Sequence, residues 1–351
     1  MNTLQRDTNL DACRALVMIH IVCVIHVLLF FHIYNEWARS LLLFEMPAIF
    51  FISGAAQQLV KRERGFKETV INRLKRVIMP FYVFFVILYL WLIIMTLAGG
   101  GPGKFHIDVT SLTAAEILKT AVTGGCNHIP YYGYTWFISC YMIISCSLPL
   151  QVKLLKHVPA WLYLVFWALV TLMLTPLHFP AEIEIKNLPL YNFFYIAGYV
   201  YYRSKPTGWF YAVWAASAAF TVYGFADGFM MPMQDHKFPA DIYFLIFGTA
   251  WMCTFLFLLR KVRLPYGRFL KIWNVRGYNI YLYQILTEYT IYCITLPFAS
   301  FLGNELIHFV VCFLLAITFN TATSYVTFNI ENYALDKITA LFKRNRQRQS
   351  K

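Results

Sequence analysis

Long apolar stretches separated by short polar connections run along almost the whole chain. Continuous hydrophobic runs occur at about 15–34, 41–60, 77–98, 135–150, 160–176, 188–202, 209–226, 240–259, 278–297 and 304–328. A helix crosses the hydrocarbon core of a bilayer in about 20 residues, whereas membrane barrels show shorter alternating segments. The pattern predicts an all-α, polytopic transmembrane helical bundle of about ten spans.

The connections show no appended soluble domain, so we expect residues 1–351 to form a single transmembrane domain. The longest connection, 99–134, opens with Gly-Gly-Gly-Pro-Gly, which cannot continue a helix. Its middle, 112–122, has helical periodicity and predicts a short amphipathic helix. A basic segment, 337–351, follows the last span and predicts a cytoplasmic tail.

The composition excludes a soluble enzyme. Of the 351 residues, 59% are hydrophobic and 13% are charged, whereas soluble domains carry about a quarter charged residues. The eight cysteines show no Cys-x-x-Cys or Cys/His zinc spacing, so we expect neither a disulfide framework nor a metal site. The partner that this composition predicts is the lipid bilayer.

The net charge of +13 follows membrane topology. If the N-terminus is cytoplasmic, 25 of the lysines and arginines lie on the cytoplasmic side and 5 on the other. Basic residues concentrate in the cytoplasmic connections of membrane proteins. The split therefore predicts that both termini are cytoplasmic, and we expect no nucleic acid among the partners.

The first span carries a cation near its cytoplasmic edge and imidazoles deeper inside. Arg14 lies at that edge, His20 about one third in and His26 about two thirds across. Twelve positions separate Arg14 from His26, a helix rise of about 18 Å. Two interpretations stay open. Either Arg14 and His26 contact opposite ends of one long ligand, or Arg14 snorkels to lipid phosphates and His26 is a hydrogen-bonded core histidine.

The second span holds a carboxylate and a run of small residues. Glu45 lies near the outer edge of the span, where it either faces an external vestibule or pairs with Arg39. Gly54 is followed by Ala55 and Ala56, and small residues let two membrane helices approach closely. We therefore expect Gly54 to serve helix packing.

Two further pairs of polar residues lie at helical spacing. Arg73 and Arg76 stand where the third span enters the membrane, and an i, i+3 spacing on a regular helix places both on one face. Their planar guanidinium groups suit a phosphate or pyrophosphate, while ordinary positive-inside charge is the alternative. In the ninth span, Gln284 and Glu288 form either an interhelical hydrogen-bonded pair or the lining of a pocket.

These elements in this order resemble the membrane-bound acyltransferase family 3, which are integral-membrane enzymes that acylate cell-surface sugars. The family's Leu-Asp-x-x-Arg entry with a deep histidine resembles Leu10-Asp11-Ala12-Cys13-Arg14 with His26, and its Met-Pro-x-x-Phe-Phe-x-x-Ser-Gly run resembles residues 46–54. Its cytoplasmic Arg-x-x-Arg before a proline resembles Arg73-Leu74-Lys75-Arg76 with Pro80. Its Trp-Phe-Leu and Ile-Tyr-Leu motifs are similar to Trp136-Phe137-Ile138 and Ile280-Tyr281-Leu282.

Two features depart from the family pattern. The family usually has ten residues between the arginine and the deep histidine, and this chain has eleven. At 100° per residue, eleven positions return to within about 20° of the same face, whereas twelve leave the histidine about 120° away. A single π-bulge between Arg14 and His26 restores the alignment, and without one His20 inherits the role. Gln284 stands where the family often has a second histidine.

The resemblance implies an acyl-CoA-dependent O-acyltransferase. It implies transfer of an acyl group, usually acetyl, from cytoplasmic acyl-CoA to a hydroxyl of an extracytoplasmic glycan or glycolipid. Arg14, Arg73 and Arg76 would hold the CoA phosphates, and His26 would act as general base. Residues of a possible pocket are Glu45, Ser53, Trp136, Tyr281, Gln284 and Glu288.

The same resemblance implies the partners and the location. Acetyl-CoA, or another acyl-CoA such as succinyl-CoA, would be the donor substrate rather than a bound cofactor, and a cell-surface carbohydrate would be the acceptor. The expected location is the bacterial cytoplasmic membrane, as a multi-pass protein. A transporter or flippase for a lipid-linked sugar or a small solute is the alternative, because it also places polar groups within a bundle of spans.

Overall fold

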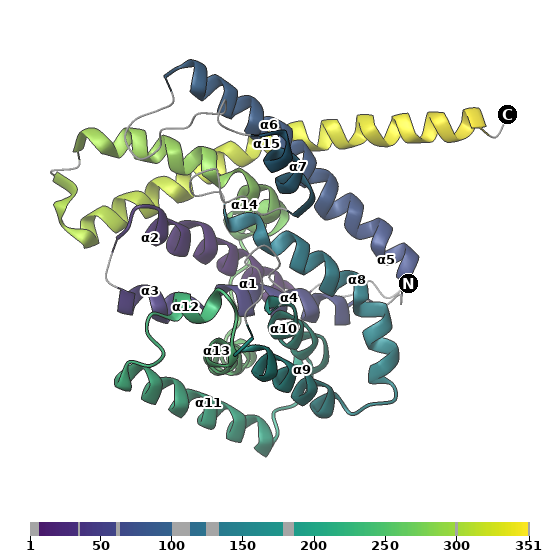
Figure 1. Cartoon of the computed structure of the whole chain (residues 1–351), viewed down its shortest axis with the longest axis vertical. Coiled ribbons are helices and arrows are strands. Elements are labelled where there is room, and N and C mark those ends of the chain that lie inside the picture. The colour runs from purple at the N-terminus through teal and green to yellow at the C-terminus, as the bar shows by residue number, and fades with distance from the viewer. Residues whose placement is uncertain are drawn as a thin grey trace. The chain divides into compact units, whose positions relative to one another are not determined.

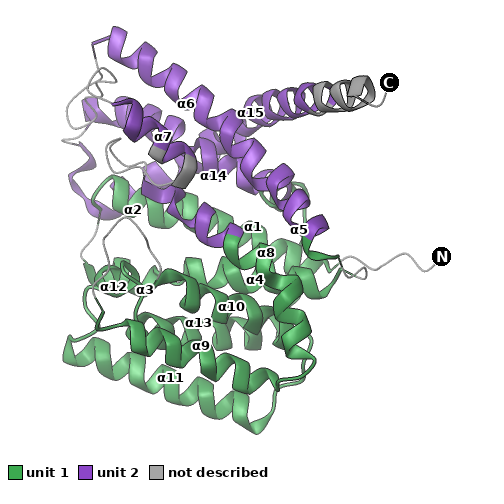
Figure 2. Ribbon diagram, turned by 45° about the vertical axis from the view of Figure 1, so that its right-hand side comes forward, with its two compact units in different colours: residues 1–66, 143–274 green, residues 67–142, 275–351 purple. Residues whose placement is uncertain are grey.

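The computed structural model describes residues 7–33, 36–60, 64–99, 113–123, 133–177, 186–298 and 301–349. The regular structure in these ranges is helical, and no strand occurs among the described residues (Figure 1). Figure 2 shows two compact units: unit 1 comprises residues 1–66 and 143–274, and unit 2 comprises residues 67–142 and 275–351. The prediction of an all-α fold is confirmed.

Unit 1 contains the first two predicted spans and four later ones. Its helices are α1 (Thr8–Ile19), the π-helical segment η1 (His20–Ile25), α2 (His26–Phe30), α3 (Glu36–Leu42), α4 (Glu45–Gln58), most of α8 (Phe137–Leu155), α9 (Ala160–Leu174), α10 (Asn187–Tyr201), α11 (Gly208–Asp227), α12 (Met233–Lys237), α13 (Ile242–Lys261) and the start of α14 (Arg268–Thr295). Asp7 and Asp241 cap α1 and α13, because each carboxylate accepts a hydrogen bond from a backbone N–H three residues on, at 3.0 Å.

The backbones of α4 and α10 touch at two glycines. A Cβ atom placed on Gly54 would lie 1.8 Å from the carbonyl oxygen of Tyr195, and one on Gly198 would lie 1.9 Å from the carbonyl oxygen of Phe51. Only glycine permits so close an approach. The prediction that Gly54 serves helix packing is confirmed, and its partner is α10.

Unit 2 contains the third predicted span and the last two. Its helices are α5 (Phe66–Arg73), the π-helical segment η2 (Leu74–Ile78), α6 (Met79–Leu97), α7 (Ala114–Thr123), the 3-10 turn η5 (Gly133–Trp136), the start of α8, most of α14, the 3-10 turns η6 (Leu296–Phe298) and η7 (Phe301–Gly303), and α15 (Glu305–Gln349).

Helix α6 packs along a single stripe. Phe84, Leu88 and Leu92, which recur every four residues, are fully buried, and Phe84 lies edge-on to Tyr283 of α14 with 5.0 Å between ring centroids. The opposite face exposes other large apolar side chains, among them Leu97 with 83% of its surface accessible. A helix with apolar residues on both faces suits a lipid environment.

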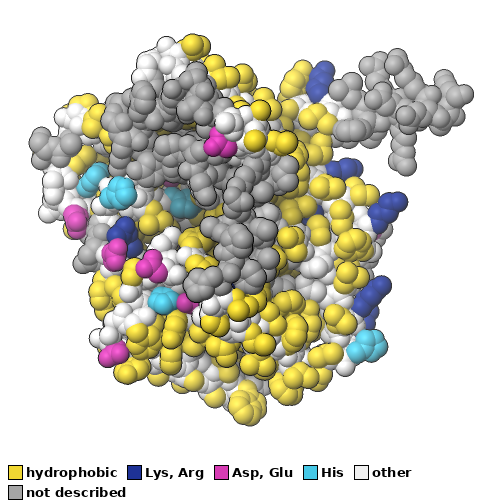
Figure 3. Space-filling view, in the orientation of Figure 1, with side chains coloured by type: hydrophobic (Ala, Val, Ile, Leu, Met, Phe, Trp, Pro, Cys, Tyr) yellow, Lys and Arg dark blue, Asp and Glu magenta, His cyan; other side chains and the backbone are white. Residues whose placement is uncertain are grey.

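Several helical segments are long and apolar enough to cross a membrane. By length and composition they are Thr8–Phe30, Glu36–Gln58, Phe66–Leu97, Gly133–Leu155, Ile242–Lys261 and Glu305–Ile338. Each of the ten predicted spans coincides with a helix or a run of helices in the described chain. Figure 3 shows hydrophobic side chains covering the face of unit 1 over α9 and α11. The ten-span count and the cytoplasmic termini stay predictions.

The long connection before α8 contains the expected short helix, α7. Thr113 and Glu116 form a reciprocal cap at its start, because the Glu116 carboxylate accepts from the backbone N–H of Thr113 at 2.8 Å and the Thr113 hydroxyl accepts from that of Glu116 at 3.2 Å. The amphipathic helix predicted for residues 112–122 is thus confirmed over 114–123. Residues 100–112 and 124–132 lie outside the described chain.

The last helix includes most of the basic segment 337–351, whose cytoplasmic location stays a prediction. Helix α15 continues through the expected tail to Gln349. The 45 residues of α15 contain neither glycine nor proline, so nothing in the sequence ends the helix where the apolar stretch gives way to the basic one.

Candidate functional site

The first span contains a π-bulge between Arg14 and His26. The segment η1 interrupts the α-helix at residues 20–25, and the backbone N–H of His26 donates to the carbonyl of Ile21, five residues earlier. The extra residue of the turn absorbs the eleventh intervening residue, so His26 returns to within about 20° of the Arg14 face. The sequence prediction of a bulge between Arg14 and His26 is confirmed.

Arg14 and His26 are both half-buried in unit 1. Arg14 forms no hydrogen bond or ion pair with any other residue that the structure describes. A guanidinium in a span without a protein counter-anion calls for an anion from outside the protein, either a lipid phosphate or a ligand.

His20, the alternative base, contacts the second span through its ring. Its Nε2 lies 2.8 Å from the carbonyl oxygen of Leu42, and its ring stacks on Phe44 at 4.6 Å. Phe44 in turn stacks on Trp251 at 4.3 Å. These contacts place His20 at the α3–α4 junction, beside the next ionisable residue of the site.

That residue is Glu45, which pairs with a lysine from a distant part of the chain. The Lys237 ammonium donates to Glu45 Oε1, and the two side chains are 6% and 2% exposed. The alternative of a pair with Arg39 is wrong, because Glu45 pairs with Lys237 and the Arg39 guanidinium lies 3.6 Å from the Glu36 carboxylate on its own helix. The alternative of an open vestibule is not what the structure shows either, since Glu45 is buried. Sequence reasoning missed Lys237, which it counted only as an external charge.

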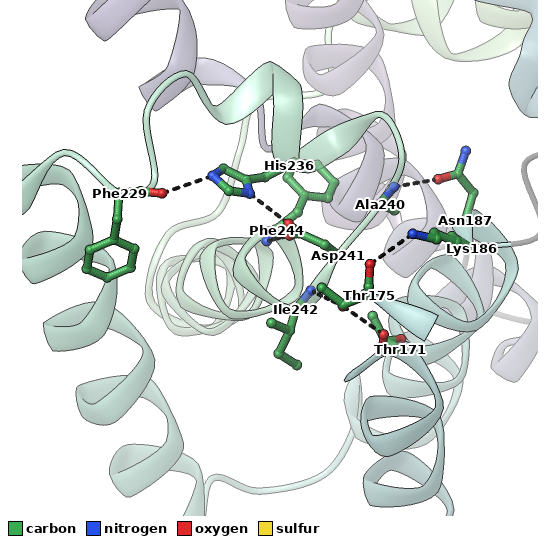
Figure 4. A network of polar contacts seen from close by, with 10 residues as sticks. All are labelled: Thr171, Thr175, Lys186, Asn187, Phe229, His236, Ala240, Asp241, Ile242 and Phe244. Atoms are coloured by element: carbon green, nitrogen blue, oxygen red, sulfur yellow. Dashed lines mark hydrogen bonds and ion pairs between the residues drawn. The ribbon is translucent and has the colours of Figure 1, made fainter. Parts of the chain in front are cut away.

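Lys237 is carried by the connection between α11 and α13, residues 228–241, which we call the strap. The backbone N–H groups of Met233 and Ala240 donate to Ser40 and Asn187 at 3.0 Å each. Figure 4 shows the second of these bonds beside those of His236 and of Lys186, whose ammonium donates to the Thr175 carbonyl at 2.9 Å. The strap is thereby fixed to α3 and α10.

His236 bonds two other residues of the strap. Its Nδ1 lies 2.7 Å from the Asp241 carboxylate and its Nε2 lies 3.1 Å from the carbonyl oxygen of Phe229 (Figure 4). Both partners only accept hydrogen bonds, so both ring nitrogens donate and the imidazole is protonated in this arrangement. The hydrogen bond to Asp241 raises the pKa of His236 against the opposing effect of burial.

In unit 2, Arg73 and Arg76 do not share a face. Arg73 is buried, and its Nη1 donates to the Tyr141 hydroxyl at 3.2 Å, whereas Arg76 is exposed. The expectation of a common face is wrong because η2 begins directly after Arg73 and closes a turn with a bond from Met79 to Leu74. A π-helical turn contains more residues than an α-helical turn. The step from Arg73 to Arg76 therefore turns through a smaller angle about the helix axis than on a regular helix.

The two later family motifs meet within unit 2. The Tyr281 hydroxyl donates to the carbonyl of Tyr134, and the Tyr134 hydroxyl donates to the carbonyl of Leu282 at 2.8 Å. Phe137, which follows Trp136, lies edge-on to Tyr281 at 4.9 Å. Tyr281 therefore joins α14 to the start of α8, and its hydroxyl proton is engaged.

Gln284 and Glu288 are both buried on α14, at 0% and 2% exposure. Glu288 Oε1 has no hydrogen-bond partner among the described residues. Around this pair, polar side chains join α14 to α15: Thr287 donates to Asn320 at 2.8 Å, and Asn279 donates to Glu331 at 2.8 Å. Sequence reasoning missed this polar seam, although Asn320 and Glu331 stand out as polar residues in and beside an apolar run.

The predicted site residues thus fall into two groups. Arg14, His26, Glu45 and the half-buried Ser53 belong to unit 1, and Arg73, Arg76, Trp136, Tyr281, Gln284 and Glu288 belong to unit 2. Among the described residues, no three His, Cys, Asp or Glu side chains gather as metal ligands.

Comparison with known proteins identifies the family. A family model described as an acyltransferase domain matches residues 7–328, which extend from the start of α1 far into α15. No curated protein and no solved structure matches the chain. With its membrane-spanning helices, the chain is a multi-pass membrane protein that belongs to acyltransferase family 3.

Proposed function

We propose that this membrane acyltransferase takes an acyl group, acetyl in the first instance, from cytoplasmic acyl-CoA and transfers it to a hydroxyl of an extracytoplasmic glycan or glycolipid. The observation that carries the proposal is the π-helical turn at residues 20–25. It compensates for the extra residue of this chain and aligns Arg14 with His26, the pair that the family pattern places on one face.

The donor side of the proposal rests on the arginines. CoA carries a pyrophosphate and a further phosphate, and planar guanidinium groups bind such anions through paired N–H donors. Arg14 has no protein counter-anion among the described residues, and Arg76 is exposed. In unit 2, the Tyr141 hydroxyl and ring hold Arg73 in place, with 5.6 Å from the guanidinium carbon to the ring centroid.

The acceptor side rests on His26. As general base, His26 takes the proton of the acceptor hydroxyl while the oxygen attacks the thioester carbonyl. The carbon–sulfur bond then breaks, and the CoA thiolate receives the proton. The rise from Arg14 to His26 is about 18 Å, similar to the pantetheine arm at about 15–20 Å, so phosphates at one end leave the thioester near the other.

A direct experiment tests this function. The purified full-length protein is incubated with acetyl-CoA labelled in the acetyl group, together with membranes that contain the envelope carbohydrate. We expect release of free CoA and alkali-labile label on carbohydrate, both dependent on the protein. Absence of acetyl-CoA binding and of CoA release would contradict the proposal, and a protein that moves sugar without consuming acyl-CoA would be a transporter.

A further inference from the structure

The Glu45–Lys237 ion pair is incompletely satisfied. Glu45 Oε2 is buried and has no hydrogen-bond partner among the described residues. The Lys237 ammonium has three N–H donors, and among the described residues its contacts are Glu45 Oε1 and the ring of Phe238, at 5.3 Å. A buried ion pair repays its desolvation only when its remaining donors and acceptors are bonded. The pair therefore offers hydrogen-bonding capacity that the described protein does not use.

His20 adds a second acceptor to the same place. Its ring stacks on Phe44, the residue directly before Glu45, with 4.6 Å between ring centroids. The Leu42 carbonyl only accepts hydrogen bonds, so His20 Nε2 carries a proton toward it, and Nδ1 of the neutral imidazole is left as an acceptor. A carboxylate oxygen, an ammonium and an imidazole nitrogen thus gather where α4, the first span and the strap meet.

This array matches a neutral ligand rich in hydroxyl groups. Each hydroxyl both donates and accepts, so it can donate to Glu45 or His20 and accept from Lys237. An anionic ligand would be repelled by Glu45 and a cationic one by Lys237. By the charge distribution along the chain, the strap lies on the side opposite to the basic connections, which is the side of the acceptor.

We propose that Glu45, Lys237 and His20 form the subsite that binds hydroxyl groups of the carbohydrate acceptor, an inference that rests on the proposed function. Lys237 closes the subsite when it is empty. Its flexible four-carbon stem lets the ammonium withdraw from Glu45 without movement of the backbone. The incoming hydroxyls then replace the bonds that the pair loses.

Two double variants separate binding from structure. Glu45→Met with Lys237→Met replaces the pair by unbranched apolar side chains, an exchange that folds commonly tolerate. Glu45→Lys with Lys237→Glu keeps the ion pair but moves the carboxylate onto the strap. Each variant gene replaces the chromosomal copy in the source organism. The readouts are alkali-labile acetate on envelope carbohydrate and equilibrium binding of acetyl-CoA to the purified full-length protein.

We expect both variants to bind acetyl-CoA within about twofold of the parent protein while carbohydrate acetate falls at least tenfold. Parent-like acetate in either variant, or loss of acetyl-CoA binding in both, would show that the pair is structural and would overturn the inference.

The matched control is Ser40→Ala, which removes the strap's bond from Met233 but no group of the subsite. It should keep acetate within about twofold, and a tenfold loss there would assign the effect to the seating of the strap and overturn the inference. Failure of the proposed function is distinguishable, because the unaltered protein would then bind no acetyl-CoA and deletion of its gene would leave acetate unchanged.

Discussion

Arg73 and Arg76 occupy different surroundings although they stand three residues apart. Arg73 is buried against Tyr141, and Arg76 reaches the surface. A role in topology requires only positive charge from either residue. A role in phosphate binding requires the planar, forked donors of arginine. Substitution of the arginines by lysine therefore preserves the role in topology and removes the role in phosphate binding.

Replacing both residues, Arg73→Lys with Arg76→Lys, separates these roles. We expect acetyl-CoA affinity to fall at least tenfold, about 1.4 kcal/mol, while membrane insertion stays normal. Equilibrium binding to the purified protein measures the effect. Tyr141→Phe, which removes only the hydroxyl bonded to Arg73, should cost less. Unchanged affinity in the lysine variant would return both residues to ordinary positive-inside charge.

His236 makes the stability of the strap depend on pH. Its pKa is raised in the folded protein by the hydrogen bond to Asp241, above an unfolded value of about 6.5. The pair therefore stabilises the fold fully below pH about 6.5, and this contribution is lost as the pH rises through the folded pKa.

We expect the thermal unfolding midpoint of the parent protein to decline over that pH range, and Asp241→Asn to flatten the decline. Asparagine caps a helix as well as aspartate does, so the variant keeps the start of α13 intact. Scanning fluorimetry in detergent at several pH values measures the effect, and parallel curves for the two proteins would show that the pair does not titrate as described.

At the scale of whole elements, the first span shows how a helix absorbs an insertion. Segment η1 lies between two regular helices, and its wider turn, closed by the hydrogen bond from the His26 N–H to the Ile21 carbonyl, takes up the extra residue. A second π-helical turn, η2, directly follows Arg73, within the Arg-x-x-Arg motif that ends at Arg76. π-Helical turns are rare and are frequently found at functional sites.

Deletion of Val24, a half-buried residue of η1, tests this role. It restores the ten-residue spacing, so a regular helix then keeps Arg14 and His26 aligned, and we expect carbohydrate acetylation within about tenfold of the parent. Insertion of one alanine after Val24 instead turns His26 by about 100° and should abolish transfer. Equal losses in both variants would show that the alignment does not govern activity.

The contact of α4 with α10 predicts strong sensitivity at two glycines. Gly54→Ala places a Cβ 1.8 Å from a backbone carbonyl oxygen, which no side-chain rotation relieves. Overpacking of this kind costs about 1–3 kcal/mol, so we expect a lower thermal unfolding midpoint. Gly208→Ala is the matched control, because nothing lies within 4 Å of its Cβ. Equal midpoints for the two variants would contradict the observed approach of the helices.

The helices and the bulge could be predicted from sequence because their signals are local. Hydrophobic run length marks the spans. The family resemblance places Arg14 and His26 on one face, and with eleven residues between them, at 100° per residue, that alignment needs one π-turn. The partners of Glu45 and Arg73 could not be predicted in this way. Lys237 lies 192 positions from Glu45 and Tyr141 lies 68 from Arg73, and only tertiary packing brings such residues together.

As a whole molecule, the chain is a multi-pass membrane acyltransferase of family 3. The proposed chemistry divides its residues into those that bind the donor and those that act on the acceptor. Loss of a donor residue should weaken acyl-CoA binding, whereas loss of the base should stop transfer without weakening binding. The proposed function can therefore be tested by comparing acyl-CoA binding with acyl transfer in variants of the protein.

The most direct measurement is that of acetyl-CoA binding and acetyl transfer by the His26→Ala protein beside the parent and His20→Ala. We expect His26→Ala to bind acetyl-CoA nearly as well as the parent and to transfer no acetate to carbohydrate, while His20→Ala keeps part of the transfer. Parent-like transfer by His26→Ala would show that His26 is not the base, because the residue that the bulge aligns with Arg14 would then have no part in the reaction.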